Sequence, residues 1–364
     1  MGKTSKSPKA VITVAYLIGQ CALPTYAHRY SPKKFTQPQL FACLVLKEFL
    51  QLDYRKLEEL LVDCPELQAA IHLNEVPHFT TFQKAARRLL KSSLAERLLD
   101  KTIRLAQLRG RLGSSVPLAA GDGTGWESHH VSHYYVKRRA SCSKHWQKTT
   151  YARFPKAGIL CDCTSHMILS IVPGRGPGPD IKHFRSLLDQ GLQRTRIDTV
   201  ALDAGYDAEH THEYARQERG VRTLIPPLIG RRTDKPPSGY WRRQMARRLH
   251  LTRYGQRWQV ETVNSMLKRL MGSALRARQY WSQCRETLLR AITHNVMILR
   301  RAEVFYRAVL TASPVSVDVC PSRNRGSVGS RSSTPSGSTG MKAECGIWRR
   351  AIASGSRPDE DGSW

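Results

Sequence analysis

Residues 197–203 read Ile197-Asp-Thr-Val-Ala-Leu-Asp203, a short apolar run that ends in an acid. A run of this length, bounded by polar residues, predicts a buried strand rather than a helix. A helical pattern over residues 207–219 and a second apolar run at 221–225 follow it. The order strand, helix, strand indicates a sheet with helices packed on it.

The sequence before this strand predicts a hairpin. Two strand-like runs, at 151–163 and 167–172, are joined by Thr164-Ser-His166, and an amphipathic helix over 180–192 comes next. A hairpin group followed by alternating strands and helices is typical of a mixed sheet. We therefore expect an α/β fold in which helices flank one mixed sheet.

The first part of the chain has a helical pattern instead. Thr36 and Gln39 have the spacing of a capping box, and further helices are expected from about residue 53 and after the turn at 77–81. The last of these carries Lys84, Arg87, Arg88 and Lys91, which indicates a DNA-binding face or a solvated one. The sequence thus predicts a loosely ordered basic arm (1–35), a small all-α and DNA-binding domain (36–112), the α/β domain (113–310) and a disordered tail (311–364).

The charge of the chain narrows its partners. It has 58 Lys and Arg against 29 Asp and Glu, a net charge of +29, and about +27 of this lies in residues 1–312. Such a balance predicts a polyanionic partner. No apolar run reaches the roughly 18–20 residues of a membrane span, and no secretory signal is recognisable. The nine cysteines show no paired CxxC spacing, so we expect reduced thiols in a cytoplasmic protein.

Two aspartates share a sequence context. Asp122 and Asp203 each end an apolar run and are followed by glycine within two residues, which predicts a position at the rim of a sheet. Together with a glutamate, such carboxylates form a ligand set for hard divalent ions. Asp207 is an alternative to Asp203, which we prefer because it stands at the strand end.

The glutamate is found on a predicted helix that begins near Tyr254. At about 100° per residue, Tyr254, Arg257, Glu261 and Lys268 fall on one narrow stripe. A separate apolar stripe faces a core; it consists of Val260, Val263, Leu267, Leu270 and Ala274. The polar stripe suits a metal-dependent enzyme that acts on a nucleic-acid backbone, although a solvated charged face has the same pattern.

A dense basic run precedes this helix. It contains Arg231, Arg232, Arg242, Arg243, Arg247, Arg248 and Arg253, which we expect to contact DNA phosphates. The tryptophans Trp241, Trp258 and Trp281 fit base stacking or a core position, the second being the commoner role. His129, His130 and His133 follow Asp122, but hard-ion chemistry does not need them, and Asp180 is expected to be a helix N-cap.

Three segments together resemble a DDE transposase of bacterial insertion sequences. They are Ala120-Gly-Asp-Gly-Thr124, Leu202-Asp-Ala-Gly-Tyr-Asp207 and Tyr254-x2-Arg257-x3-Glu261-x6-Lys268. The last is similar to the Tyr-Arg-Glu-Lys (YREK) signature of the IS-four family, and the resemblance extends over residues 36–310. The interval of 58 residues between Asp203 and Glu261 indicates that the large β-rich insertion of some members is missing.

The resemblance implies an RNase H-like catalytic core in which Asp122, Asp203 and Glu261 bind two Mg²⁺ ions, with Mn²⁺ as a substitute. It implies that Tyr254, Arg257 and Lys268 hold DNA near the cleaved end. The implied reaction is hydrolytic nicking at the ends of the element, followed by attack of the freed 3′-OH on target DNA. The implied partners are double-stranded DNA, as terminal inverted repeats and target, and a second copy of the chain in a homodimer at the bacterial nucleoid.

Two other functions compete with an active transposase. A catalytically inactive remnant that only binds DNA would have the same charge, although the three acids are intact. A cellular nuclease built on the same core is a weaker alternative, because it would need neither the helical N-terminal region nor the YREK residues. A hairpin intermediate on the element end is a further possibility, as in some relatives.

Overall fold

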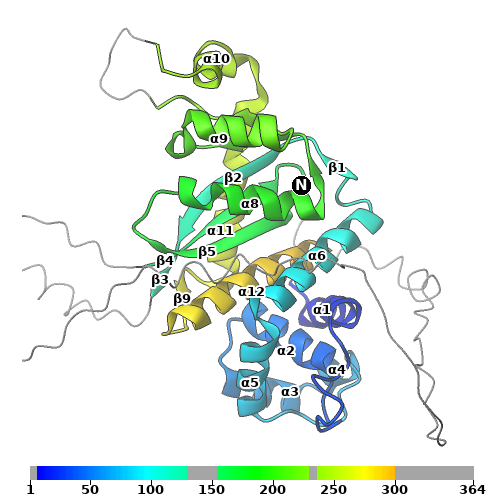
Figure 1. Ribbon diagram of the computed structural model, residues 1–364. Coiled ribbons are helices and arrows are strands. Elements are labelled where there is room, and N and C mark those ends of the chain that lie inside the picture. Colours follow the sequence, from blue (N-terminus) through cyan, green and yellow to red (C-terminus); the bar gives the residue numbers. More distant parts are fainter. Residues whose placement is uncertain (1–5, 129–153, 229–235, 300–364) are drawn as a thin grey trace, which may run out of the picture. The chain divides into compact units, whose positions relative to one another are not determined.

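The centre of the structure is a five-stranded mixed sheet with the strand order β5-β4-β2-β7-β8 (Figure 1). Its strands are β2 (Ala119–Gly125), β4 (Phe154–Asp162), β5 (Ile168–Gly176), β7 (Thr199–Leu202) and β8 (Arg222–Leu224). The computed structural model describes residues 6–128, 154–228 and 236–299. The chain divides into two units, 1–312 and 313–364, and the description concerns the first.

The sheet combines an antiparallel and a parallel part. β4 is antiparallel to both β2 and β5, whereas β7 is parallel to β2 and β8 is parallel to β7. The prediction of an α/β fold with a mixed sheet is therefore confirmed. β2 belongs to both parts, because it pairs with β4 on one side and with β7 on the other.

The predicted strand at 197–202 is present but interrupted. Arg196–Ile197 form β6, which pairs with β1 (Ser115–Val116), and after Asp198 the chain continues as β7 beside β2. Val200, Ala201 and Leu202 are all buried, as expected for a strand with neighbours on both sides.

The predicted hairpin is also present, and it is longer than expected. β4 and β5 pair from Phe154, opposite Gly176, to the turn at Thr164-Ser-His166. The Asp162 carboxylate accepts hydrogen bonds from the Ser165 backbone NH at 2.7 Å and its hydroxyl at 2.6 Å. The sequence predicted an end before Pro173, but β5 is an edge strand, where proline is tolerated.

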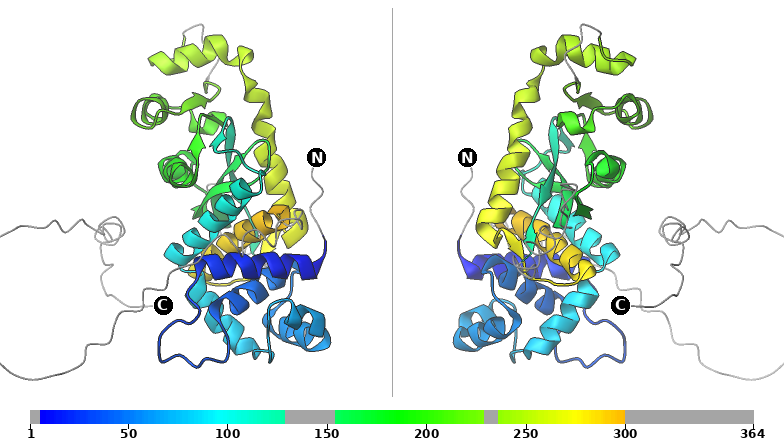
Figure 2. Two further views of the ribbon diagram at one scale, coloured as in Figure 1. Left: turned by 90° about the vertical axis from the view of Figure 1, so that its right-hand side faces the viewer. Right: turned by 90° about the vertical axis from the view of Figure 1, so that its left-hand side faces the viewer.

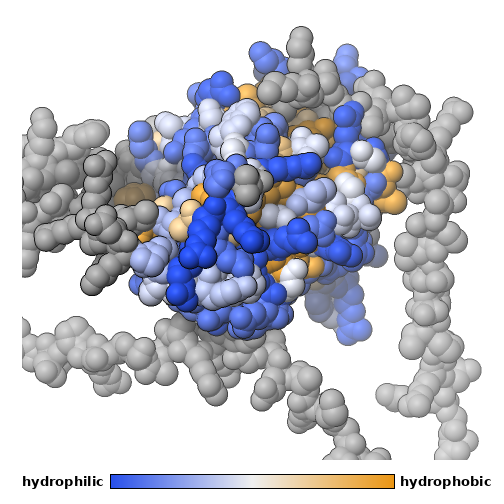
Figure 3. All heavy atoms as spheres, turned by 90° about the horizontal axis from the view of Figure 1, so that it is seen from above, coloured by the Kyte–Doolittle hydropathy of each residue, from blue (hydrophilic) through white to orange (hydrophobic). Residues whose placement is uncertain are grey.

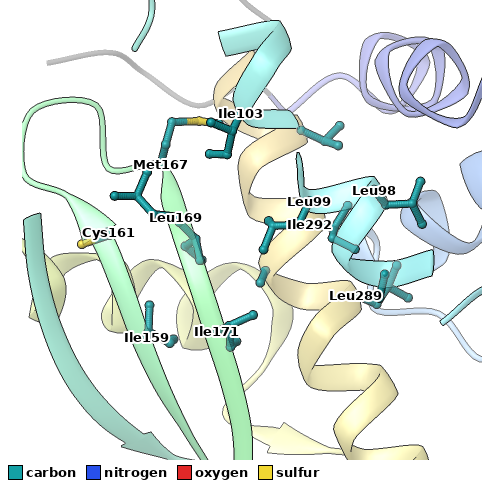
Figure 4. Close-up of a cluster of buried hydrophobic side chains, with 14 of the residues drawn as sticks. Leu98, Leu99, Ile103, Ile159, Cys161, Met167, Leu169, Ile171, Leu289 and Ile292 are labelled. Carbon is teal, nitrogen blue, oxygen red and sulfur yellow. The ribbon is translucent and has the colours of Figure 1, made fainter. Parts of the chain in front are cut away.

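Helices cover both faces of the sheet. Figure 2 shows α8 (Ile181–Arg194) and α9 (Glu209–Glu213) on one side and α11 (Trp258–Met271) on the other. α12 (Tyr280–Leu299) and α6 (Ser92–Leu108) also pack on β5. The buried side chains between these elements come from β4, β5, α6 and α12 (Figure 4); among them are Ile159, Cys161, Leu169, Ile171, Leu98, Ile103, Leu289 and Ile292.

The N-terminal region is helical, as predicted. Its helices are α2 (Gln37–Phe49), α3 (Tyr54–Asp63), α4 (Pro65–Ala69), α5 (Phe79–Leu89) and α6. The capping box of Thr36 and Gln39 is formed in both directions, and Asp53 caps α3. One hydrophobic cluster extends from Val11 to Leu299, so the buried core is continuous across the boundary expected at residue 112. The predicted domain limits stay predictions.

The expectation of a loosely ordered arm over residues 1–35 is wrong for much of its length. Pro8–Ala22 form α1, with Ser7 as its N-cap, and α1 packs against α2. Ile12, Ala15 and Ile18 are at most 1 % exposed. These apolar residues recur at helical spacing, and their burial stabilises a helix that the basic, Pro-containing flanks concealed.

A second helix was missed within the Pro-rich basic loop. Tyr240–Arg248 form α10, which follows Gly239 at φ 95°. Met245 is its one buried residue among those described, so the helix has almost no apolar face by which to recognise it. In the described part of the chain, no helix is both long and apolar enough to cross a membrane.

Candidate active site

Asp122 and Asp203 lie at neighbouring positions of the sheet. The parallel ladder between β2 and β7 ends with Gly121 opposite Leu202, and each aspartate directly follows. The prediction placed Asp122 after its strand, but β2 continues to Gly125 because β4 still pairs with it. Asp203 follows the last residue of β7, as predicted, and is exposed.

Asp122 is partly buried and held by two neighbours. Its Oδ1 accepts the Gly123 backbone NH at 2.8 Å, and its Oδ2 accepts the Asn264 side-chain amide of α11 at 3.2 Å. The pKa of Asp122 is raised from 3.8 to about 6, chiefly by burial; the Gly123 NH and Arg257 oppose the shift, and Asp180 and Asp203 contribute to it. Several acids are thus gathered around one carboxylate.

The sequence analysis did not place Asp180 in this site. Asp180 precedes α8, but its side chain makes no capping hydrogen bond. Its carboxylate lies 2.7 Å from the Lys156 ammonium and so close to Gly123 that a Cβ there would stand 2.0 Å from Oδ1. Asp180 does stand at the N-cap position of α8, as expected, but it makes no capping hydrogen bond, because its carboxylate points to the sheet rather than to the helix backbone.

Two buried polar side chains lie beside these acids with atoms that lack a hydrogen-bond partner within the described structure. The Tyr206 side chain is 1 % exposed and its hydroxyl is unpaired. Burial raises the pKa of Tyr206, and Asp180, Asp122 and Asp203 add to the shift. Asn264 is 8 % exposed, and its Oδ1 is also unpaired. Such unpaired atoms are uncommon in protein interiors and often mark a functional site.

Glu261 lies on α11 with 55 % of its side chain exposed, and it forms an ion pair with Arg257. Within the described ranges, no group of three His, Cys, Asp or Glu side chains is arranged to hold a metal ion. The structure therefore brings Asp122 and Asp203 together, with Asp180 as an unexpected neighbour, and leaves Glu261 bonded to an arginine.

Two of the remaining YREK residues lie just before α11, and the third lies in its last turn. Tyr254 and Arg257 belong to a 3-10 turn (Arg253–Arg257) rather than to the helix, which begins at Trp258, so the predicted single helix from Tyr254 is wrong. Arg257 has electrostatic contact with Asp122 and Tyr254, and Tyr254 with Asp203. Lys268 is partly exposed two turns beyond Glu261.

The apolar stripe of α11 faces the core as predicted. Val260, Val263 and Leu267 are 0 % exposed, and Leu270 is partly buried. Ala274 is buried too, but it lies in β9 (Ala274–Leu275), a short strand that pairs with β3 (Glu127–Ser128).

One of the predicted DNA-binding arginines has an internal partner. The Arg242 guanidinium donates to both oxygens of Asp207, whose side chain is 0 % exposed. Glu209 accepts the backbone NH groups of Trp241 and Arg242, so α10 is fastened to α9. This pairing gives the Asp207 carboxylate an internal partner, and it distinguishes Arg242 from the exposed arginines.

Those other arginines are on the surface. Arg243, Arg247, Arg248 and Arg253 are exposed. Seen from the α10 side, the described surface is largely hydrophilic (Figure 3). Trp258 and Trp281 are 47 % and 63 % exposed, whereas Arg216 stacks on the Trp241 ring. Arg231, Arg232, His129, His130 and His133 lie outside the described residues.

The chain shows similarity to one known class of protein. Residues 117–296 match the protein family described as transposase DDE domain. The matched segment contains the sheet, both strand-borne aspartates and α11. The match supports a DDE transposase, an enzyme of the transposase nuclease type that binds DNA. No curated protein matches the chain.

Proposed function

We propose that this protein is the DNA transposase of an insertion sequence and belongs to the IS-four type with the YREK signature. The observation that carries the proposal is the placement of Asp122 and Asp203 at adjacent positions of β2 and β7, within the segment that matches the transposase DDE domain. A glutamate follows on α11, which packs on β2.

The catalytic domain is proposed to be RNase H-like. Three antiparallel strands, β5-β4-β2, are continued by two parallel strands, β7 and β8. Helices cover both faces of the sheet, and Asp203 directly follows the carboxyl end of β7. Ligands of open α/β sheets bind at such carboxyl ends.

The acids suit a divalent metal cofactor. All their donors are oxygen atoms, which Mg²⁺ prefers, and the Asp180 carboxylate, whose Oδ1 pairs with Lys156 at 2.7 Å, lies beside Gly123. A cation would also offset the repulsion by which Asp180 and Asp203 raise the pKa of Asp122. We propose that Asp122 and Asp203 hold two Mg²⁺ ions, or Mn²⁺, together with Glu261 after it leaves Arg257. Bound metal would activate the attacking oxygen and stabilise the leaving one.

The cations around Glu261 are proposed to hold the DNA. Arg257 lies among Asp122, Asp203 and Glu261, and a guanidinium released from Glu261 would bind a backbone phosphate. Tyr254 and Lys268 flank it along the chain. The exposed arginines of the α10 region add contacts with duplex DNA; they are Arg243, Arg247, Arg248 and Arg253. Joining two element ends requires at least a dimer on DNA.

The proposed reaction consists of two in-line phosphoryl transfers. In the first, a water oxygen bonds to the phosphorus at the element boundary, the bond to the 3′ oxygen breaks, and that oxygen leaves as a 3′-OH. In the second, this 3′-OH bonds to a target phosphorus and a target 3′ oxygen leaves. The chain's own groups position the phosphate and the acids, and no covalent enzyme intermediate is needed.

The test is cleavage of labelled linear DNA that carries the element's own ends, with Mg²⁺ or Mn²⁺. We expect nicks at the element boundary with the wild-type chain and none with Asp203→Asn or Glu261→Gln, while both variants still bind the ends. Asp198→Asn is the matched control, because Asp198 is a surface residue paired with Arg196 at 3.1 Å.

The same experiment distinguishes an active transposase from a remnant that only binds DNA. Binding of the ends without cleavage in either metal would contradict an active enzyme and leave a DNA-binding remnant. Normal cleavage by Glu261→Gln would show that the third acid is wrongly assigned.

A further inference from the structure

A cavity of about 430 Å³ lies between the N-terminal helices and the start of α12, and its lining includes none of Asp122, Asp203 and Glu261. Its walls come from α2, α3, α5 and the segment that follows α11. Five cationic and three acidic residues line it: Lys47, Arg87, Arg276, Arg278 and Arg285, with Glu48, Asp53 and Glu286. What this cavity binds depends on which of these charges are already paired.

All three acids are paired within the protein. The buried Arg290 donates to Glu48 at 2.9 Å and to Glu286 at 3.1 Å. Glu286 also accepts the backbone NH groups of Arg276 and Ala277. Asp53 accepts the Lys56 backbone NH at 2.8 Å as the cap of α3. Each of the three carboxylates thus has a hydrogen-bond partner within the protein, and two of them share the charge of Arg290.

Two of the five cations are also engaged. Lys47 lies 3.5 Å from Glu48 and over the Tyr54 ring, and Arg276 has electrostatic contact with Asp53. Arg87, Arg278 and Arg285 differ, because none of them makes an ion pair or hydrogen bond with another described residue. Arg87 and Arg278 are exposed, and Arg285 is partly exposed.

Two of these guanidinium groups converge on one point although they come from distant parts of the chain. Burial, Glu48 and Glu286 raise the pKa of Tyr54 to about 12, and Arg87 and Arg285 act against the shift. Arg87 of α5 and Arg285 of α12 therefore both lie near the same phenol. Three unpaired cations around one opening form a site for an anion.

We propose that this cavity binds the phosphate backbone of the DNA duplex that flanks the cleaved end, through Arg87, Arg278 and Arg285. The inference rests on the proposed function. The segment that carries Arg278 continues directly from α11, whose first turns hold Glu261. The ten residues from Glu261 to Met271 span about 15 Å of helix, the length of about four base pairs. The duplex would thus follow α11 past Lys268 to the cavity.

A free phosphate ion is a poorer occupant than DNA. The opening is lined by guanidinium groups on two separate walls and is larger than one phosphate. A duplex backbone presents successive phosphates, and a chain of net charge +29 is attracted to a polyanion over a distance.

The experiment measures binding of the full chain to a long duplex carrying the element's end over a range of salt concentrations. The test variant combines Arg87→Gln, Arg278→Gln and Arg285→Gln. Each lost phosphate contact lowers the slope of log K against log salt by about 0.9, so we expect a fall of about 2.7. Single variants, each expected to lower the slope by about one, replace the triple variant if it does not fold.

The matched control combines Arg97→Gln, Arg104→Gln and Arg111→Gln, which remove the same charge from exposed positions on and after α6. The control should retain the wild-type slope. An equal fall in both variants, or no fall in the test variant, overturns the proposal. Competition by inorganic phosphate without any change in the DNA slope overturns it too, and leaves a small-anion site.

Cleavage with Mg²⁺ is measured in parallel. If the wild type cleaves and the test variant has an unchanged salt slope, the proposed function stands and the cavity is not a DNA-binding site. If the wild type never cleaves but its DNA binding depends on the three arginines, the cavity is a DNA-binding site and the catalytic function is rejected.

Discussion

Asp122 and Asp203 stand next to each other because the parallel ladder of β2 and β7 ends one residue before both of them. Gly121 and Leu202 are the last pair, so the next residue of each strand carries the acid. The register of two strands thereby fixes the spacing of two carboxylates, with no loop between the acids and the sheet. Rigid placement of this kind is what catalytic groups require.

Burial of Asp122 beside other acids lowers the stability of the fold at high pH. Burial raises the pKa of Asp122 from 3.8 to about 6, so the fold binds this proton more tightly than the unfolded chain does. The resulting stabilisation is present below pH 3.8 and is lost as pH rises through 6. Asp122→Asn should therefore raise the free energy of unfolding at pH 8 by up to about 3 kcal/mol, at about 1.4 kcal/mol per pKa unit.

Denaturant unfolding in chelator at pH 8 and pH 4 checks this prediction. The advantage of the variant should shrink at pH 4, where Asp122 itself is largely protonated in the fold. Mg²⁺ should narrow the difference at pH 8 if the acids bind it. Equal stability of the two proteins at both pH values would contradict the prediction.

The position of the Asp180 carboxylate leaves room only for a glycine at residue 123. A Cβ at position 123 would lie 2.0 Å from the Asp180 Oδ1, so Gly123→Ala must displace this carboxylate or the strand. The neighbouring residue of the strand is Asp122, a proposed catalytic acid, and its displacement by about 1 Å can reduce a rate about a hundredfold; we expect a loss of this order in end cleavage. Gly205→Ala is the control, since nothing lies within 4 Å of its Cβ. Similar losses in both variants would show that the contact is unimportant.

Arg242 and Arg247 should differ although both lie on α10. Arg242→Ala leaves the Asp207 carboxylate buried without its partner, and loss of one partner of a buried pair typically costs about 3 kcal/mol or more. Arg247 is exposed, and Arg247→Ala should change the unfolding free energy by less than about 0.5 kcal/mol while weakening DNA binding. Thermal unfolding and DNA titration of the two variants give the comparison. Asp207→Asn added to Arg242→Ala should restore part of the stability.

Two buried histidines predict sensitivity to acid. Burial lowers the pKa of His294 and of His212 from 6.5 to about 4. Both stay neutral in the fold while the unfolded chain takes up protons below pH 6.5, so stability falls from pH 6.5 towards 4. Each contributes a slope of up to about 1.4 kcal/mol per pH unit. In His294→Gln the change in unfolding free energy per pH unit between these pH values should be smaller than in the wild type, as measured by urea unfolding. An identical slope in both proteins would show that His294 does not cause the loss of stability in acid.

The sequence allowed the elements with a strong local pattern to be predicted. The apolar run before Asp203, the capping box of Thr36 and the buried stripe of α11 all follow from spacing alone. The hairpin around Thr164-Ser-His166 was predicted for the same reason. In each case the residues that decide the structure are close together in the chain.

The parts that could not be predicted depend on contacts between distant residues. The Asp180 carboxylate lies against Gly123, beside Asp122, because a glycine leaves room for it, and nothing in the local sequence indicates this contact. The helix α10 has one buried side chain among its described residues, and it is held by Asp207 and Glu209 from α9 and the turn before it.

Arg290 has a consequence for how this protein can be divided. Its guanidinium, 2 % exposed, joins Glu48 of α2 to the carbonyl oxygens of Gly272 and Ala274 after α11. Truncating the chain before α6 would remove Glu48 and open the core to water. The helical part is therefore not a detachable module. Swapping it between related elements to change end recognition would succeed only if the grafted piece supplied an acid at this place.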